Sequence, residues 1–181
     1  MEKWDEWQKV YLHGTLVIWP PEEVREIVNH QRKVYDPKSA ATCETHITLT
    51  QPLLNPLVEK DLDMIRKIVG RFKTFDINYG PLKSFLPYPC IWYEIQPVEK
   101  ILAIREALHK TKIFNLSLKH TDDFIPHMTI TEGLSGPEVN EALLEQLKLE
   151  SYSGTFKCRD VTLIIPDEKF HFWVKERFLL E

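Results

Sequence analysis

Apolar residues recur along the chain with two periods, one typical of helices and one typical of strands. Residues 10–19 are mostly apolar and predict a strand, and the following Pro20-Pro21-Glu22-Glu23 is typical of a helix start. A helix is predicted over 21–35 because apolar residues follow there at intervals of three and four. The same patterns predict helices over 58–70, 98–109 and 138–148, and strands over 74–79, 82–86, 90–96, 155–165 and 170–178.

A five-residue signature occurs twice between these elements. His46-Ile47-Thr48-Leu49-Thr50 recurs as His127-Met128-Thr129-Ile130-Thr131. Side chains alternate across a strand, so each copy predicts a strand with histidine and threonine on one face and apolar residues on the other. Two such strands side by side would place two imidazoles and several hydroxyls in one cleft.

The order strand, helix, loop, signature strand, helix also occurs twice, over 10–70 and 90–148. A solenoid would need more and shorter repeats, so this is a single degenerate duplication. We expect an α+β fold with two lobes related by a pseudo-twofold axis. Each lobe would be an antiparallel sheet with helices packed outside, around a central cleft that the two signature strands face.

The duplication suggests one domain over 10–181, a division that the length of 181 residues also favours. Residues 1–9 form a charged N-terminal extension that contains Trp4 and Trp7. These tryptophans could dock on the domain or on a partner, and the sequence leaves both alternatives open.

Composition narrows the functional classes. An apolar content of 43% is that of a soluble globular protein. A net charge of −4 argues against a protein that coats long nucleic-acid duplexes, although a short oligonucleotide or an RNA end could still bind. Three widely spaced cysteines favour reduced thiols over a disulfide framework. No signal peptide or membrane span is recognisable. We expect a cytoplasmic monomer without membrane contacts.

The paired signature suits acid–base chemistry on a phosphate ester. Cleaving a phosphodiester needs a base for the nucleophile and an acid for the leaving oxygen, and histidine serves both roles because its reference pKa is about 6.5. His46 and His127 could divide these tasks, while Thr48 and Thr129 donate hydrogen bonds to the non-bridging oxygens. Neither signature contains a carboxylate, so we expect neither a metal nor another cofactor.

The arrangement resembles the 2H phosphoesterase superfamily, in the branch of 2′-5′ RNA ligase-like proteins and cyclic nucleotide phosphodiesterases. Residues 16–24 look like its first strand and helix, and 124–130 look like its second motif, including the proline before histidine. The resemblance implies that His46, Thr48, His127 and Thr129 are the catalytic set. It also implies metal-free hydrolysis of 2′,3′-cyclic phosphates or related 2′-linked phosphodiesters in nucleotides or short RNA.

Two positions depart from that branch, which often has an arginine shortly after the second motif and an aromatic residue after the first. Here they hold Glu132 and Gln51. Glu132 would repel a phosphate if it entered the cleft. Substrate binding is therefore expected to differ, and the name RNA ligase is not carried over.

Several other residues could contribute to the cleft. Tyr11 and His13 on the predicted first strand could line it, and Lys119 and His120 lie in a loop that could close over a substrate. An ordinary surface or core position is the alternative for each. The aromatic residues near the midpoint of the chain could stack bases, but we assign most of them to the core. They are Phe85, Tyr88, Trp92 and Tyr93.

Two further functions stay open at this point. The cleft could bind nucleotides or RNA ends without turnover, although such a module has no need of two proton-transfer groups. A metal-dependent hydrolase using His46, His127 and Glu132 is the other alternative, although no local cluster supplies the three or four convergent ligands of a metal site.

Overall fold

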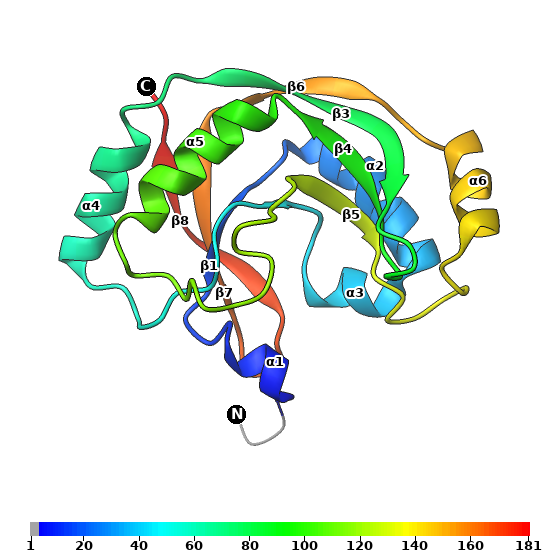
Figure 1. Ribbon diagram of the computed structural model, residues 1–181, viewed down its shortest axis with the longest axis horizontal. Helices are drawn as coiled ribbons and strands as arrows, with labels where there is room; N and C mark the ends of the chain where they lie inside the picture. The colour runs from blue at the N-terminus through cyan, green and yellow to red at the C-terminus, as the bar shows by residue number, and fades with distance from the viewer. Residues whose placement is uncertain (1–3) are drawn as a thin grey trace.

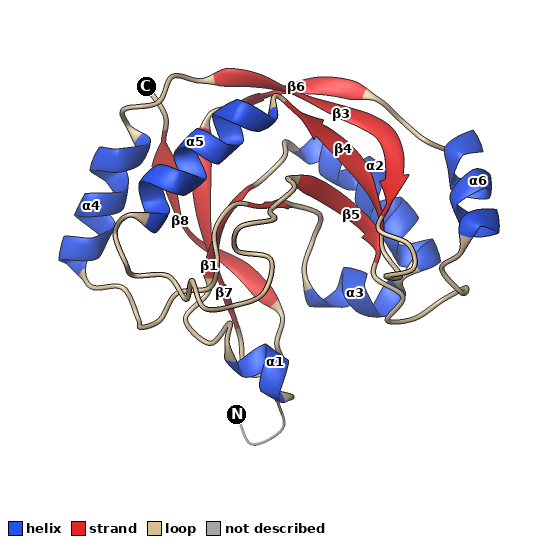
Figure 2. Cartoon of the chain, viewed as in Figure 1, coloured by secondary structure: helices blue, strands red, loops and turns tan. Residues whose placement is uncertain are grey.

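The computed structural model describes residues 4–181 and contains one eight-stranded antiparallel sheet in the order β6-β3-β4-β5-β2-β1-β7-β8. The sheet curls, with α4 and α5 beside one half and α2 and α6 beside the other (Figure 2). The strands are β1 (Thr15–Ile18), β2 (Ile47–Thr48), β3 (Phe75–Ser84), β4 (Ile91–Gln96), β5 (His127–Thr131), β6 (Gly154–Cys158), β7 (Asp160–Pro166) and β8 (Phe172–Leu179).

The α+β class and the antiparallel pairing are confirmed. The strands belong to one continuous sheet, however, rather than to a separate sheet for each lobe. One half of that sheet holds β3 to β6, and the other holds β1, β2, β7 and β8. The signature strands β2 and β5 meet at its centre.

The four long helices agree with prediction to within a few residues, since each carries an apolar stripe that packs on the sheet. They are α2 (Glu22–Tyr35), α4 (Glu59–Val69), α5 (Val98–His109) and α6 (Glu141–Leu149). Two short helices were not predicted, because α1 (Glu6–Lys9) and α3 (Pro37–Thr42) are too short to show a period. Asp36 caps α3 by accepting a hydrogen bond from the backbone N–H of Ser39.

Some predicted strand boundaries were wrong. The predicted strand 10–19 begins only at Thr15, because the chain turns at Gly14, where φ is +84° and a Cβ would lie 2.1 Å from the Ile164 carbonyl oxygen. The strands predicted over 74–79 and 82–86 form the single strand β3, and the strand predicted over 155–165 is divided into β6 and β7.

The N-terminal extension docks on the domain. The Trp4 indole is buried and its Nε1–H donates a 2.9 Å hydrogen bond to the Glu168 carbonyl oxygen. Figure 1 shows α1 at one end of β7 and β8. This contact decides between the two alternatives left open for Trp4.

Two further expectations concern the cysteines and membrane spans. Cys43, Cys90 and Cys158 are all free and buried. Within residues 4–181, the helices are too short or too polar to cross a bilayer.

Candidate active site

The two signature strands are direct neighbours. β2 and β5 pair in antiparallel fashion with Ile47 opposite Met128. Both apolar side chains are fully buried, so the residues that alternate with them face the other side of the sheet. The side chains on that face line one cavity of about 360 Å³, and they are His46, Thr48, His127 and Thr129.

Both imidazoles are held in the same way. Nδ1 of His46 lies 2.8 Å from the Glu44 carbonyl oxygen, and Nδ1 of His127 lies 2.7 Å from the Ile125 carbonyl oxygen. A carbonyl oxygen only accepts hydrogen bonds, so each Nδ1 carries the hydrogen. Nε2 of each neutral ring therefore keeps its lone pair, and among residues 4–181 it has no hydrogen-bond partner.

Burial lowers the pKa of both histidines. For His46 the pKa falls to about 4, because burial is reinforced by the positive charges of Arg32 and His127 and only partly opposed by the hydrogen bond to Glu44. Burial also lowers the pKa of His127, against the hydrogen bond to Ile125. Both rings are thus neutral at pH 7 in the free protein, and each can accept a proton at Nε2.

Aromatic rings fix the planes of the two imidazoles. Trp19 stacks on His46 with ring centroids 6.3 Å apart and an interplanar angle of 9°. Phe85 meets His127 edge-on at 5.3 Å, and Trp92 lies 5.6 Å from the same ring. Trp92 is buried, as expected, but it supports the site as well as the core.

The last threonine of each signature has a structural role. Thr50 Oγ1 accepts a 3.1 Å hydrogen bond from the Leu16 backbone N–H, and Thr131 Oγ1 accepts one from the Gly133 backbone N–H at 3.1 Å. Both side chains are fully buried. Each therefore stabilises the chain beside a signature strand and does not reach the cavity.

Arg32 of α2 also lines the cavity, and sequence analysis missed it. Its Nη1–H donates to the Thr129 carbonyl oxygen at 2.9 Å, and its Nη2 donates to the Ser39 and Cys43 carbonyl oxygens at 3.2 and 3.0 Å. The side chain is only 4% exposed. It places a positive charge near His46 while tying β5 to α3. Arg32 lies four residues after Val28 and therefore on the buried face of the helix, and this spacing could have indicated that its side chain is buried.

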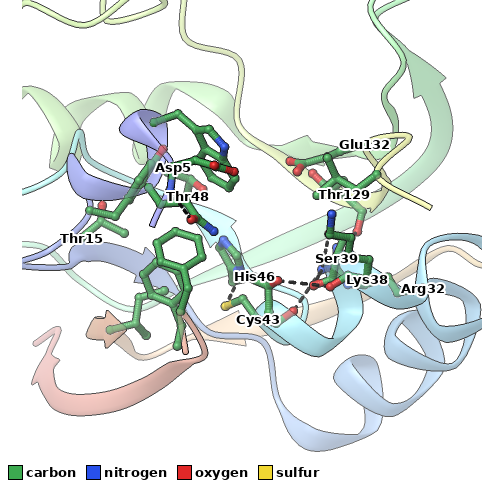
Figure 3. Close-up of a pocket in the computed structure, with 18 of the residues that line it drawn as sticks. Asp5, Thr15, Arg32, Lys38, Ser39, Cys43, His46, Thr48, Thr129 and Glu132 are labelled. Carbon is green, nitrogen blue, oxygen red and sulfur yellow. Dashed lines mark hydrogen bonds between the residues drawn. The ribbon is translucent and has the colours of Figure 1, made fainter. Parts of the chain in front are cut away.

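The cavity has two chemically different sides in Figure 3. Arg32, Lys38, Ser39 and Glu132 lie on one side, Asp5 and Thr15 lie on the other, and His46 stands between them. Crowding by protein atoms raises the pKa of Glu132, and Asp36 adds to this while Arg32 opposes it.

Of the two positions that depart from the pattern of the ligase-like branch, Glu132 lines the cavity and Gln51 does not. Glu132 does enter the cavity, where its backbone N–H donates a 2.9 Å hydrogen bond to Asp36. Gln51 instead donates from Nε2 to Thr121 Oγ1 at 2.9 Å and does not line the cavity.

Of the other residues predicted to line the cleft, one lines the cavity and three do not. Tyr11 lines the cavity, whereas His13, Lys119 and His120 do not. His13 lies in the turn before β1. Lys119 and His120 are both exposed to solvent in their loop. Arg105 holds this loop in place by donating a 3.0 Å hydrogen bond to the Thr121 carbonyl oxygen. Sequence analysis also missed the lining residues Lys38, Trp7, Phe170 and Phe172.

Within residues 4–181, no group of three or more histidine, cysteine or acidic side chains is placed to hold a metal ion.

A family model described as the 2′-5′ RNA ligase superfamily matches residues 20–169. The chain belongs to this superfamily. The match confirms the resemblance found from the two signatures, and it begins after α1 and β1. It also contains both histidines and both threonines that line the cavity.

Relatives and solved structures agree with this membership. The chain is 25% identical to a protein of Oceanobacillus iheyensis named as a candidate phosphoesterase, over 78% of this chain and 85% of that one. A similarly named Bacillus cytotoxicus protein is 29% identical over 76% and 78%. Escherichia coli LigT complexed with 3′-AMP shares the fold, with a TM-score of 0.59, 16% identity and coverage of 93% and 98%. Thermus thermophilus TT0787 has a TM-score of 0.57, 18% identity and coverage of 91% and 96%.

Proposed function

We propose that this superfamily member is a metal-independent phosphodiesterase. It would hydrolyse 2′,3′-cyclic phosphates or 2′-linked phosphodiesters of nucleotides or RNA ends by two-histidine acid–base catalysis. The observation that carries the proposal is the matched pair of imidazoles: one cavity holds His46 and His127, each with Nδ1 bound to a carbonyl oxygen and Nε2 free.

The hydrolysis needs only groups that line this cavity. One imidazole takes a proton from water as the water oxygen forms a bond to phosphorus. The other must first take up a proton at Nε2, and it donates that proton to the ribose oxygen as the bond from phosphorus to that oxygen breaks. Hydroxyl donors on Thr48 and Thr129 stabilise the charge that develops on the non-bridging oxygens, and Arg32 supplies a nearby positive charge.

The surroundings of the two rings suggest which is the base. Burial lowers the pKa of both rings, and for His46 the positive charge of Arg32 lowers it further. We therefore assign the base to His46 and the proton-donating acid to His127.

Known relatives support a nucleotide substrate. The relatives from Oceanobacillus and Bacillus carry phosphoesterase names, and E. coli LigT has been crystallised with 3′-AMP, NADP⁺ and ATP. A nucleotide with its phosphorus between the two signature strands is the ligand class that these facts favour.

The test is a substrate screen in EDTA with 2′,3′-cyclic nucleotides, 2′-5′ dinucleotides and cyclic oligonucleotides. Wild type should turn over at least one class, and the double variant His46→Ala/His127→Ala should not. His30→Ala is the matched control, because His30 is exposed on α2 and does not line the cavity. Binding without turnover would indicate a nucleotide-binding module instead. Loss of activity in EDTA that added divalent metal restores would indicate a metal-dependent hydrolase.

A further inference from the structure

An aromatic wall lines part of the cavity. It consists of Trp7 and Tyr11, from α1 and the turn after it, and of Phe170 and Phe172, from the end of the β7–β8 hairpin. Trp7 meets Phe170 edge-on with ring centroids 5.3 Å apart, and Tyr11 meets Phe172 edge-on at 6.2 Å. Two segments far apart in sequence thus build one surface inside the cavity that contains the catalytic candidates.

Phe170 is the centre of this wall. Its φ of +66° is a conformation that bulky residues rarely adopt and that glycine would adopt at lower cost. The turn is fixed by hydrogen bonds from the backbone N–H groups of Lys169 and His171 to the Asp167 carboxylate, at 2.8 and 2.9 Å. Phe170 is only 5% exposed, and its ring packs against Trp4, Trp7, Tyr11 and Phe172. Contacts of the ring therefore compensate for an unfavourable backbone position.

The wall keeps an accessible aromatic surface and has polar groups at its rim. Trp7 is 53% exposed although it packs on Phe170. Asp5 and Gln8, on the same short segment, also line the cavity. Gln8 Oε1 accepts a 2.8 Å hydrogen bond from the Asp5 backbone N–H, so the Asp5 carboxylate and the Gln8 Nε2 donor are the groups offered to a ligand. A planar ring with polar edges suits such a surface, since one face stacks on the aromatic residues while its edge finds hydrogen-bond partners.

We propose that this wall is a nucleobase subsite, an inference that rests on the proposed phosphodiesterase function. In Figure 3 Asp5 lies on the Thr48 side of His46, opposite Arg32 and Lys38. A phosphate between the histidines would therefore direct one substituent toward the wall and leave its charged oxygens near the cationic side. The family match begins at residue 20, so α1 and Tyr11 lie outside the region shared with the superfamily model.

The test measures binding and turnover for ligands with and without a base. Binding of 3′-AMP and of glycerol 1-phosphate is measured by calorimetry, and turnover of 2′,3′-cyclic AMP and of glycerol 1,2-cyclic phosphate is measured in parallel. The variants are Trp7→Ala, Trp7→Phe and Trp173→Ala. Trp173 is the matched control, because it is 45% exposed on β8 and does not line the cavity.

Trp7→Ala should weaken 3′-AMP binding by about 5- to 150-fold, the range for loss of one base–aromatic stack. It should lower kcat/KM for 2′,3′-cyclic AMP to a similar extent and leave both base-free ligands unaffected. Trp7→Phe should restore most of the affinity, and Trp173→Ala should match wild type. Equal melting temperatures for the two alanine variants would show that α1 stays docked.

The outcomes separate the two proposals. Equal affinity of wild type and Trp7→Ala for 3′-AMP would overturn the base subsite, and so would failure of wild type to bind 3′-AMP. In both cases, turnover of glycerol 1,2-cyclic phosphate that depends on the histidines would still support the phosphodiesterase. Binding of 3′-AMP that depends on Trp7, without turnover of any substrate, would support the subsite and contradict the catalytic proposal.

Discussion

Ile47 lies directly opposite Met128 where β2 and β5 pair at the centre of the sheet. In this antiparallel register, the next positions place His46 opposite Thr129 and Thr48 opposite His127. Each histidine therefore faces the threonine of the other signature. A phosphate bound over this pair would meet an imidazole and a hydroxyl from each half of the duplicated sequence.

Replacing either histidine should abolish most turnover while the fold persists. His46→Ala and His127→Ala each remove one proton-transfer group, which is worth about 10²- to 10⁴-fold in rate. Neither side chain belongs to the apolar core, so the melting temperature should stay near that of the exposed control His30→Ala. Steady-state kinetics and thermal unfolding check both expectations. A single variant with near-normal kcat on the identified substrate would contradict the assigned roles.

Thr48→Val and Thr129→Val should lower kcat with little change in KM. Each removes a hydroxyl donor at the position where transition-state charge develops, an effect of about 10²- to 10³-fold when such a donor is lost. Valine has nearly the same shape and suits a strand, so stability should hardly change. Thr155→Val on the exposed surface of β6 is the control. An equal loss of activity in all three variants would point to a general effect of the substitution.

Local patterns explain why so much of the site could be predicted. In each signature, the histidine and threonine alternate with buried apolar residues, and the duplication shows this pattern twice. The long helices were also predictable, because stripes such as that of α2 repeat over several turns. Both features depend on residues close together in sequence.

Features that depend on distant pairing could not be predicted. Whether β2 would pair with β5 or stay in a separate lobe depends on contacts between residues 47 and 128. Arg32 was missed because a charged residue on a helix is usually solvated, whereas here three carbonyl oxygens from β5, α3 and the residue after α3 surround it. The wall of Trp7 and Phe170 joins the two ends of the chain, and no local period indicates such a contact.

Stability should fall as the pH drops from about 6.5 to 4. Burial lowers the pKa of His109 to about 4, with a smaller contribution from the Arg105 charge. Burial also lowers the pKa of His46 to about 4. Below pH 6.5 the unfolded chain binds these protons and the folded protein does not, so the free energy of unfolding decreases. Each group contributes up to about 1.4 kcal/mol per pH unit within that window.

Urea unfolding at a series of pH values measures this dependence. His109 Nε2 accepts a 3.2 Å hydrogen bond from the Gln51 backbone N–H. In His109→Gln, the amide oxygen can accept that bond without titrating, so the stability of the variant should depend less on pH between 6.5 and 4. Parallel curves for wild type and variant would show that His109 does not contribute to the acid sensitivity.

Burial lowers the pKa of His46 most, and the charge of Arg32 should lower it further. Removing a positive charge favours the imidazolium form, so Arg32→Met should raise the pKa of His46 from about 4. Arg32→Lys is the matched control, since both variants lose the forked hydrogen bonds to Thr129 and Ser39 but lysine keeps the charge. The pKa is read from the imidazole resonances of His46 in an NMR titration, and the acid limb of kcat/KM should move to higher pH in Arg32→Met alone. An equal His46 pKa in the two variants would show that burial, without the guanidinium charge, keeps the imidazole neutral.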